Sequence, residues 1–109
     1  MTNAEADETG TLHLEGALTL RTADEIKMKL LEASARYGTV EVECNEADEV
    51  DLSIIQLLLA AQLSAHAMNR TIRFAHPVSG AMRDSLERGG FLSGPTAQNH
   101  AFWLNTEIC

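Results

Sequence analysis

The sequence predicts an α/β domain in which helices stack on one face of a largely parallel sheet. Strand-like and helix-like segments alternate along the chain, and each strand-like segment alternates apolar with polar side chains. Parallel strands that helices cover on both faces read as continuous apolar runs, so the alternation indicates that one face stays polar and open. At 109 residues the chain fits a single domain.

The first strand and the first helix are expected before Gly38. Thr11–Glu15 alternates polar and apolar residues, which is typical of a strand with one buried face, and Gly16 ends it. Thr22 and Glu25 have the spacing of a capping box, which predicts a helix that begins at Thr22. Gly38 then ends the helical pattern.

A second strand and helix are expected in the middle of the chain. Val40–Cys44 alternates like the first strand and is followed by an acidic loop, Asn45–Asp51. Ser53 and Gln56 again have capping-box spacing, so the next helix is predicted to begin at Ser53 and to run to about Met68.

The third pair of elements closes the pattern. Thr71–Ala75 reads as a strand that Pro77 ends, and Ser79 is expected to cap a last helix that stops at the pair Gly89–Gly90. Phe102 and Trp103 in the tail are too apolar for water, and they either cover the core or contact another molecule; the core is favoured.

The domain boundary is expected near the N-terminus. Residues 1–10 read as a disordered acidic segment, and residues 11–109 as one domain. In the strands, one parity is polar and is expected to be exposed, namely His13, Glu41, Glu43 and Arg73. The other parity is apolar and is expected to be buried, namely Leu12, Leu14, Val40, Val42, Ile72 and Phe74.

The composition excludes several classes of function. There are 16 acidic residues against 8 Lys and Arg, a formal net charge of −8, which repels nucleic acid and anionic lipid surfaces. The best apolar run, Ile54–Ala61, is too short to insert into a membrane, and no export address is visible, so a cytoplasmic protein is expected. The cysteines, Cys44 and Cys109, form no disulfide framework and suit a reducing compartment.

No motif in the chain predicts catalysis. The histidines lack the helix spacing of a zinc site, and no Gly-x-Ser-x-Gly elbow or glycine-rich phosphate loop is present. We therefore expect no catalytic residue, no metal site and no cofactor. A small-molecule or metal site on the open sheet face is a distant alternative.

Three segments carry a resemblance to a known family. They are Leu12–Thr19 before the first helix, Val50–Ser53 at the start of the second, and Gly89–Leu92 after the third. The run from Leu12 to Leu92 resembles the STAS domain, named for sulphate transporters and anti-sigma factor antagonists. The resemblance implies a mostly parallel or mixed sheet of about four strands with helices on one face, and a non-enzymatic protein-binding function.

The resemblance also implies a switch. In bacterial anti-sigma factor antagonists the middle motif reads Asp-Ser-Ser or Asp-Ser-Thr followed by Gly, and its second hydroxyl residue is phosphorylated by a partner kinase. Ser53 matches that residue and Asp51 the aspartate, whereas Leu52 and Ile54 depart from the pattern, as does Thr19, where an aspartate is common. The implied partner is a serine kinase or anti-sigma-type protein. The alternative is a constitutive adaptor of an ABC-transporter ATPase or of a chemotaxis signalling complex.

Ser53 therefore has two interpretations. A hydroxyl that caps a helix contributes about 1 kcal/mol and explains the residue without regulation. The same position would stabilise a phosphate through the helix dipole and the first-turn amides, although the neighbouring carboxylates would oppose the added charge. The local chemistry alone favours the plain cap.

The partner is expected to bind where the loops that follow the strands gather at one edge of the sheet. These loops are residues 16–22, 45–53 and 76–79. Ile55 lies in the first helical turn, where helices are wetter, and is interpreted as an apolar anchor; packing on a neighbouring element, as expected for Leu59 and Leu63, is the alternative. The predicted partner-binding residues are Asp48, Glu49, Asp51, Ser53 and Ile55.

Overall fold

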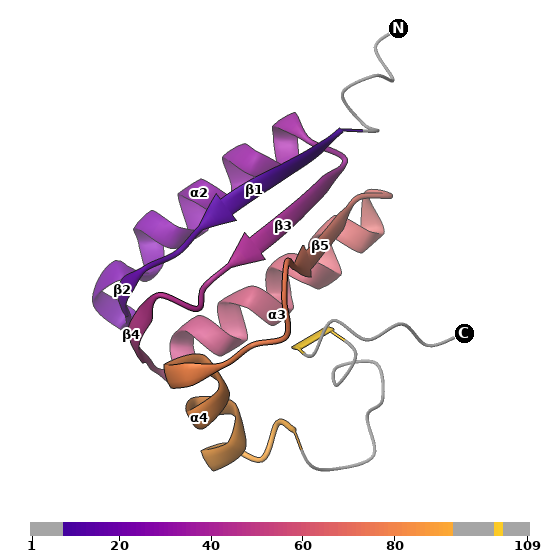
Figure 1. Cartoon of the computed structure of the whole chain (residues 1–109). Helices are drawn as coiled ribbons and strands as arrows, with labels where there is room; N and C mark the ends of the chain where they lie inside the picture. The colour runs from indigo at the N-terminus through magenta and orange to yellow at the C-terminus, as the bar shows by residue number, and fades with distance from the viewer. Residues whose placement is uncertain (1–7, 93–101, 104–109) are drawn as a thin grey trace, which may run out of the picture.

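Three parallel strands form the central sheet of the computed structural model, which describes residues 8–92 and 102–103 (Figure 1). They are β1 (Thr9–His13), β3 (Thr39–Glu43) and β5 (Thr71–Phe74), in the order β1-β3-β5. Strand β1 begins at Thr9, so the predicted disordered segment, residues 1–10, is too long by at least two residues. Residues 1–7 of that segment lie outside the described residues.

A second, smaller pair of parallel strands lies beyond the ends of β1 and β3. It consists of β2 (Gly16–Leu18) and β4 (Ala47–Val50), with an irregular register between Gly16 and Ala17. The sequence analysis assigned both segments to loops, because they are short and β4 contains two adjacent acids, which are rare in strands. In place of one sheet of about four strands, the described residues therefore form sheets of three and two.

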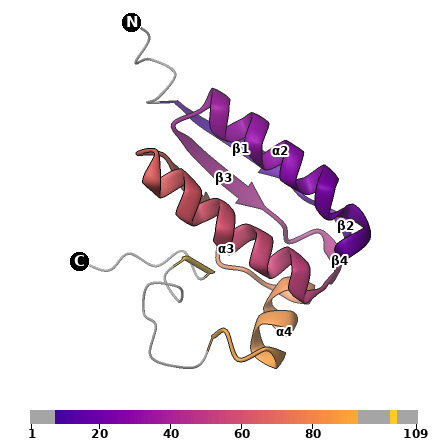
Figure 2. The same cartoon turned by 180° about the vertical axis from the view of Figure 1, so that it is seen from behind.

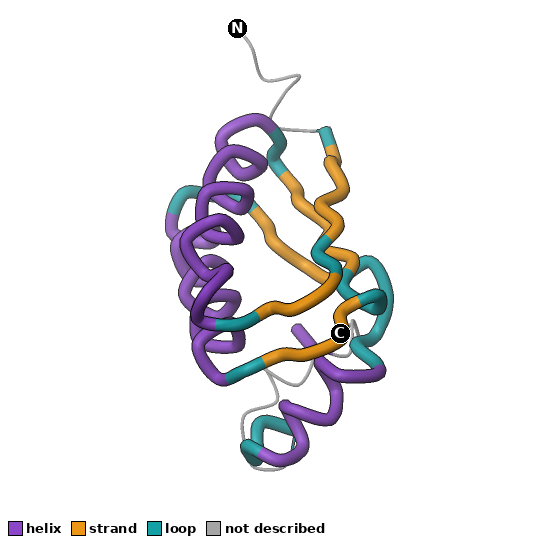
Figure 3. Tube along the Cα trace, turned by 90° about the vertical axis from the view of Figure 1, so that its left-hand side faces the viewer, coloured by secondary structure: helices purple, strands orange, loops and turns teal. Residues whose placement is uncertain are grey.

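Two helices cover one face of the central sheet, as predicted. Helices α2 (Ala23–Arg36) and α3 (Leu52–Ala67) lie side by side in front of the strands (Figure 2), and the view along the layers shows both on the same side (Figure 3). Helix α4 (Gly80–Arg88) lies instead at the end of the molecule, where the Ser85 hydroxyl donates to the carbonyl of Val50 on β4. The STAS-like α/β fold is thus confirmed.

The alternation of side chains along the strands determines which of them enter the hydrophobic core. Leu14, Val42 and Phe74 are almost fully buried, as expected from the alternation. On the opposite face His13 and Arg73 are exposed. The prediction of an exposed polar face is only partly correct, because Glu41 and Glu43 of β3 are half-buried and each is paired with a basic side chain. The pairs are Arg73 with Glu41 at 2.9 Å and His76 with Glu43 at 3.3 Å.

The start of α2 differs from the predicted capping box. The Thr22 hydroxyl donates to the carbonyls of Ala17 and Thr19 and accepts from the Thr19 amide, so it holds a 3₁₀ turn, η1 (Leu20–Thr22), in front of the helix. The same groups cannot also satisfy the first amides of α2. Glu25 forms an ion pair with Lys29 one turn along the helix instead.

The end of α3 and both ends of α4 agree with the sequence. Asn69 takes a left-handed φ of 61° after α3, and the amides of Asn69 and Arg70 bond back to His66 and Ala65 as in a Schellman motif. Helix α4 begins after Ser79 and is followed by Gly89. In the tail, Phe102 and Trp103 are buried and stack on Phe74, which confirms the core interpretation for these two residues.

Candidate functional site

Two of the three loops predicted to meet at the sheet edge are hydrogen-bonded to one another. Leu18 and Val50 are paired in β2 and β4, and the amide of Asp51 donates to the carbonyl of Leu18 at 3.1 Å. The Asp51 side chain extends this connection, because its Oδ2 accepts from the amide of Leu20 at 2.9 Å. One carboxylate therefore joins the turn before α2 to the start of α3.

The same carboxylate caps α3. Its Oδ1 accepts from the amide of Ser53 at 3.1 Å and from the Ser53 hydroxyl at 2.5 Å. The prediction that Ser53 caps the helix is therefore wrong: Asp51 is the N-cap, and Ser53 lies inside the first turn as a donor to it. The error arose because Ser53 and Gln56 happen to have capping-box spacing, although Asp51 is an equally good cap two residues earlier.

These bonds keep Asp51 ionised. The Ser53 hydroxyl is the largest cause and lowers the pKa of the Asp51 carboxyl; desolvation, the second cause, opposes it, and the amides of Leu20, Ile54 and Ser53 lower the pKa further. Around this fixed charge, Asp48 and Glu49 of β4 are both exposed. The predicted acidic rim thus lies at the surface beside Asp51 and the half-buried Ser53.

The predicted apolar anchor is not at the surface. Ile55 is 1% exposed and belongs to the hydrophobic core, so its assignment to partner binding is wrong. Figure 1 shows β4 and α4 near this end of α3. Leu63, expected to pack against a neighbour, is 69% exposed among the described residues. The exposures expected for Ile55 and Leu63 are therefore reversed.

The sequence analysis missed two exposed leucines at the edge. Leu20 of η1 is 72% exposed and Leu52, the first residue of α3, is 54% exposed. They flank Asp51 on its two sides, because Leu20 donates its amide to the carboxylate and Leu52 follows it in the chain. Placing the N-cap at Asp51 would have revealed Leu52, since the first helical residue projects back past the end of the helix.

The described residues offer little for chemistry elsewhere. They contain no group of three His, Cys, Asp or Glu side chains arranged to hold a metal ion. Burial, with a smaller effect of the Glu43 charge, raises the pKa of the Cys44 thiol to about 12, so this cysteine is not a nucleophile. Cys109 lies outside the described residues. No described helix has the length and apolar character needed to cross a membrane.

Comparison with known proteins places the chain in one family. A family model described as "Mlab, STAS domain" matches residues 1–92. The matched range includes the edge around Asp51 and the helices α2, α3 and α4. No curated protein and no solved structure matches the chain. The chain therefore belongs to the STAS domain family, whose members are in general non-enzymatic modules for protein interaction or regulation.

Proposed function

We propose that this STAS domain binds a partner protein through the edge around Asp51, and that phosphorylation of Ser53 releases the partner. We call this surface the docking edge and define it by Leu20, Asp48, Glu49, Asp51, Leu52 and Ser53. The observation that carries the proposal is the Asp51 carboxylate, which holds Leu20 and the first turn of α3 together and accepts the Ser53 hydroxyl.

The docking edge has the composition of a protein-binding surface. Leu20 and Leu52 present apolar side chains to solvent, and Asp48 and Glu49 are exposed on β4, the strand that leads to Asp51. An apolar centre with a charged rim gives affinity from burial and orientation from charge. The partner that fits is a protein with an apolar pocket bordered by Lys or Arg.

The switch follows from the bonds that Ser53 makes. A partner serine kinase would transfer the γ-phosphoryl group of ATP to Oγ: an O–P bond to Ser53 forms, the bond between the γ-phosphorus and the bridging oxygen of ADP breaks, and ADP and the hydroxyl proton are released. The modified side chain loses its donor to Asp51 and gains a dianion against an ionised carboxylate. The Ser53 amide donates to the Asp51 carboxylate, whereas the amides of Ile54 and Ile55 donate to the main-chain carbonyl of Asp51. A phosphate on Ser53 would therefore repel the carboxylate that also accepts from the Leu20 amide, and phosphorylation would weaken the connection between Leu20 and Asp51.

A constitutive adaptor is the second candidate, and two residues favour it. Leu52 and Ile54 stand where anti-sigma factor antagonists carry a hydroxyl residue and a glycine. Leu52 is exposed, and Ile54 is fully buried in the core. A permanently docked subunit, for example on a transporter ATPase or a chemotaxis kinase, would use the same edge without modification of Ser53.

Substitution of Ser53 separates the two candidates. The partner is first captured from the native cell with the unmodified chain, and binding of the purified pair is then measured by calorimetry. For a switch, Ser53→Asp weakens binding while Ser53→Ala retains it, and phosphopeptide mass spectrometry of native protein finds phosphate at Ser53. Ser79→Asp is the matched control, because it places the same charge at the exposed N-cap of α4.

Each candidate has an outcome that contradicts it. Undiminished binding by Ser53→Asp, with no phosphate at Ser53, leaves the adaptor and removes the switch. If Leu20→Asp and Leu52→Asp both leave binding intact, the docking edge itself is wrong for either candidate.

A further inference from the structure

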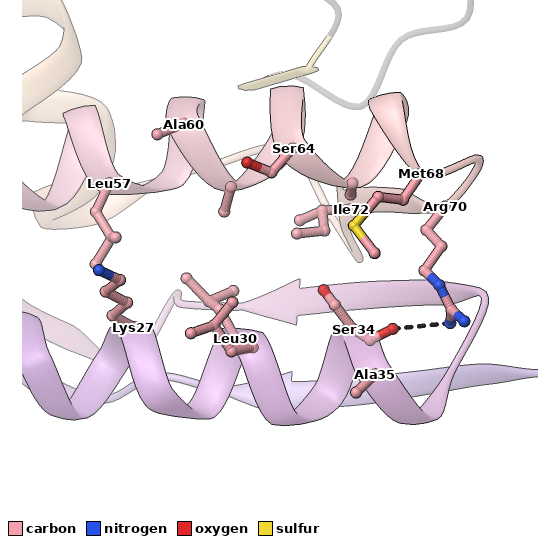
Figure 4. Close-up of a pocket in the computed structure, with 13 residues that line it drawn as sticks. Lys27, Leu30, Ser34, Ala35, Leu57, Ala60, Ser64, Met68, Arg70 and Ile72 are labelled. Atoms are coloured by element: carbon pink, nitrogen blue, oxygen red, sulfur yellow. Dashed lines mark hydrogen bonds between the residues drawn. The ribbon is translucent and has the colours of Figure 1, made fainter.

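An apolar groove runs between α2 and α3, the two helices that cover the sheet. None of the residues that line it belongs to the docking edge. Its volume is about 480 Å³. Figure 4 shows side chains of α2 below and of α3 above facing each other across it. The walls carry small side chains, whereas larger apolar ones occupy the floor and ends. The lining includes Leu30, Leu57, Ala60, Ser64, Met68 and Ile72.

The lining is unusual in its charge. The chain carries twice as many acids as Lys and Arg, yet the charged residues that line the groove are Lys27 and Arg70, both cationic. They stand at opposite ends (Figure 4). A locally cationic, apolar groove on an acidic protein favours an anionic ligand with an apolar body.

The two cations are not equivalent. Arg70 Nη1 donates to the carbonyls of Ser34 and Tyr37, at 2.8 and 3.0 Å, so its charge is partly taken up by the C-terminal end of α2. Lys27 forms no ion pair with any described residue. It lies in the second turn of α2 and reaches toward Leu57 of α3, so its ammonium group is available to a bound anion. The Lys27 end is therefore the anionic end of a bound ligand.

We propose that this groove binds a single-chain anionic amphiphile, a long-chain carboxylate, with its head group at Lys27 and its alkyl chain running toward Met68. From Leu57 to Met68 the helix rises about 16 Å at 1.5 Å per residue, which is long enough for an extended dodecyl chain. The volume lies within the roughly 300–1,000 Å³ of small-molecule sites. A partner helix, about 10–12 Å across with its side chains, would rest on the rims and leave the groove unfilled.

The test measures dodecanoate binding to the whole chain by displacement of a fluorescent fatty acid, with dodecanol as the uncharged probe. We expect Lys27→Glu to weaken dodecanoate binding by about tenfold or more, because it removes a charge-assisted hydrogen bond and adds repulsion. Dodecanol binding should change little. Lys29→Glu is the matched control, since Lys29 is on the same helix, pairs with Glu25 and does not line the groove.

A second pair of variants tests the location. Ser64→Trp places a large side chain at an exposed position of the groove wall and should abolish binding of both probes. His66→Trp makes the same change on an exposed position of α3 outside the lining and should retain binding, with circular dichroism confirming that both variants fold. Failure of the unmodified chain to bind dodecanoate, or equal weakening by Lys27→Glu and Lys29→Glu, overturns the proposal.

Self-association of the chain that Ser64→Trp abolishes, without dodecanoate binding, would also overturn it and assign the groove to a second copy. None of these outcomes bears on the docking edge, whose residues do not line the groove.

Discussion

Leu52 and Ile55 belong to the same turn of α3 and lie three residues apart, yet one is 54% exposed and the other 1% exposed. Positions three apart share a helix face, so periodicity alone would give them the same surroundings. They differ in depth, because helical side chains project toward the N-terminus. Leu52 therefore projects past the helix end, whereas Ile55, one turn further along, projects into the hydrophobic core. Burial at a helix end is set by how far the neighbouring elements extend.

The largest expected effect comes from the buried side of this turn. Ile55→Asp removes an apolar side chain from the core and leaves an unpaired carboxylate there, which should lower the free energy of unfolding by about 4 kcal/mol or more. Urea denaturation followed by circular dichroism measures this. Leu52→Asp, on the exposed side, should change the free energy of unfolding by less than about 0.5 kcal/mol. Similar losses in the two variants would contradict the difference in burial.

A smaller loss in the free energy of unfolding is expected from substitution of Asp51, which joins the turn before α2 to the start of α3. Asp51→Ala removes the cap of α3 and the acceptor of the Leu20 amide, which together should cost about 2 kcal/mol. Asp51→Asn keeps a capping oxygen and should lose less than half of that amount. The same urea experiment checks both variants, and equal stability of the Ala and Asn variants would show that neither bond contributes.

The pH dependence sharpens the role of the same carboxylate. Because hydrogen bonds in the folded state hold the pKa of Asp51 below its ordinary value of about 3.9, the unfolded chain takes up this proton first as the pH falls. The contribution is therefore complete above the ordinary pKa and is lost as the pH falls through the folded-state value.

Ser53→Ala should raise the pKa of Asp51 toward the ordinary value, since the Ser53 hydroxyl is the largest cause of the shift. Carboxyl carbon NMR titration measures it. An unchanged Asp51 titration in the Ser53→Ala variant would mean that the hydroxyl does not bond to the carboxylate in solution.

The smallest effect on stability is expected from substitution of Leu52, the exposed residue of this turn, whereas its effect on partner binding should be the greatest. Leu52→Ala removes an exposed side chain from a helix that tolerates alanine well, so the free energy of unfolding should change by less than about 0.5 kcal/mol. Affinity for the captured partner should fall by about tenfold or more if Leu52 is a central contact. Leu63→Ala changes another exposed leucine on the same helix, outside the docking edge; it is the control and should retain affinity.

Much of the fold could be predicted because it depends on local pattern. The alternation of polar and apolar residues correctly placed Leu14, Val42 and Phe74 in the core, and Ser79 and Gly89 marked the two ends of α4. Strand β4 could not be predicted, since its sequence, Ala-Asp-Glu-Val, has little strand preference of its own. It forms because the parallel partner β2 lies beside it in the folded chain.

The candidate site divides in the same way. The resemblance of Val50–Ser53 to the family motif, the exposure of Asp48 and Glu49 and the one-sided layer could be predicted, because they depend on residue type and on spacing within one element. The cap of α3 is also a local contact, between Asp51 and Ser53, and it was missed because Ser53 and Gln56 have capping-box spacing as well. The burial of Ile55 and the bond between the Leu20 amide and Asp51 could not be predicted, because each depends on a contact between segments distant in the chain, and the spacing of residues within one segment carries no information about which distant group reaches it.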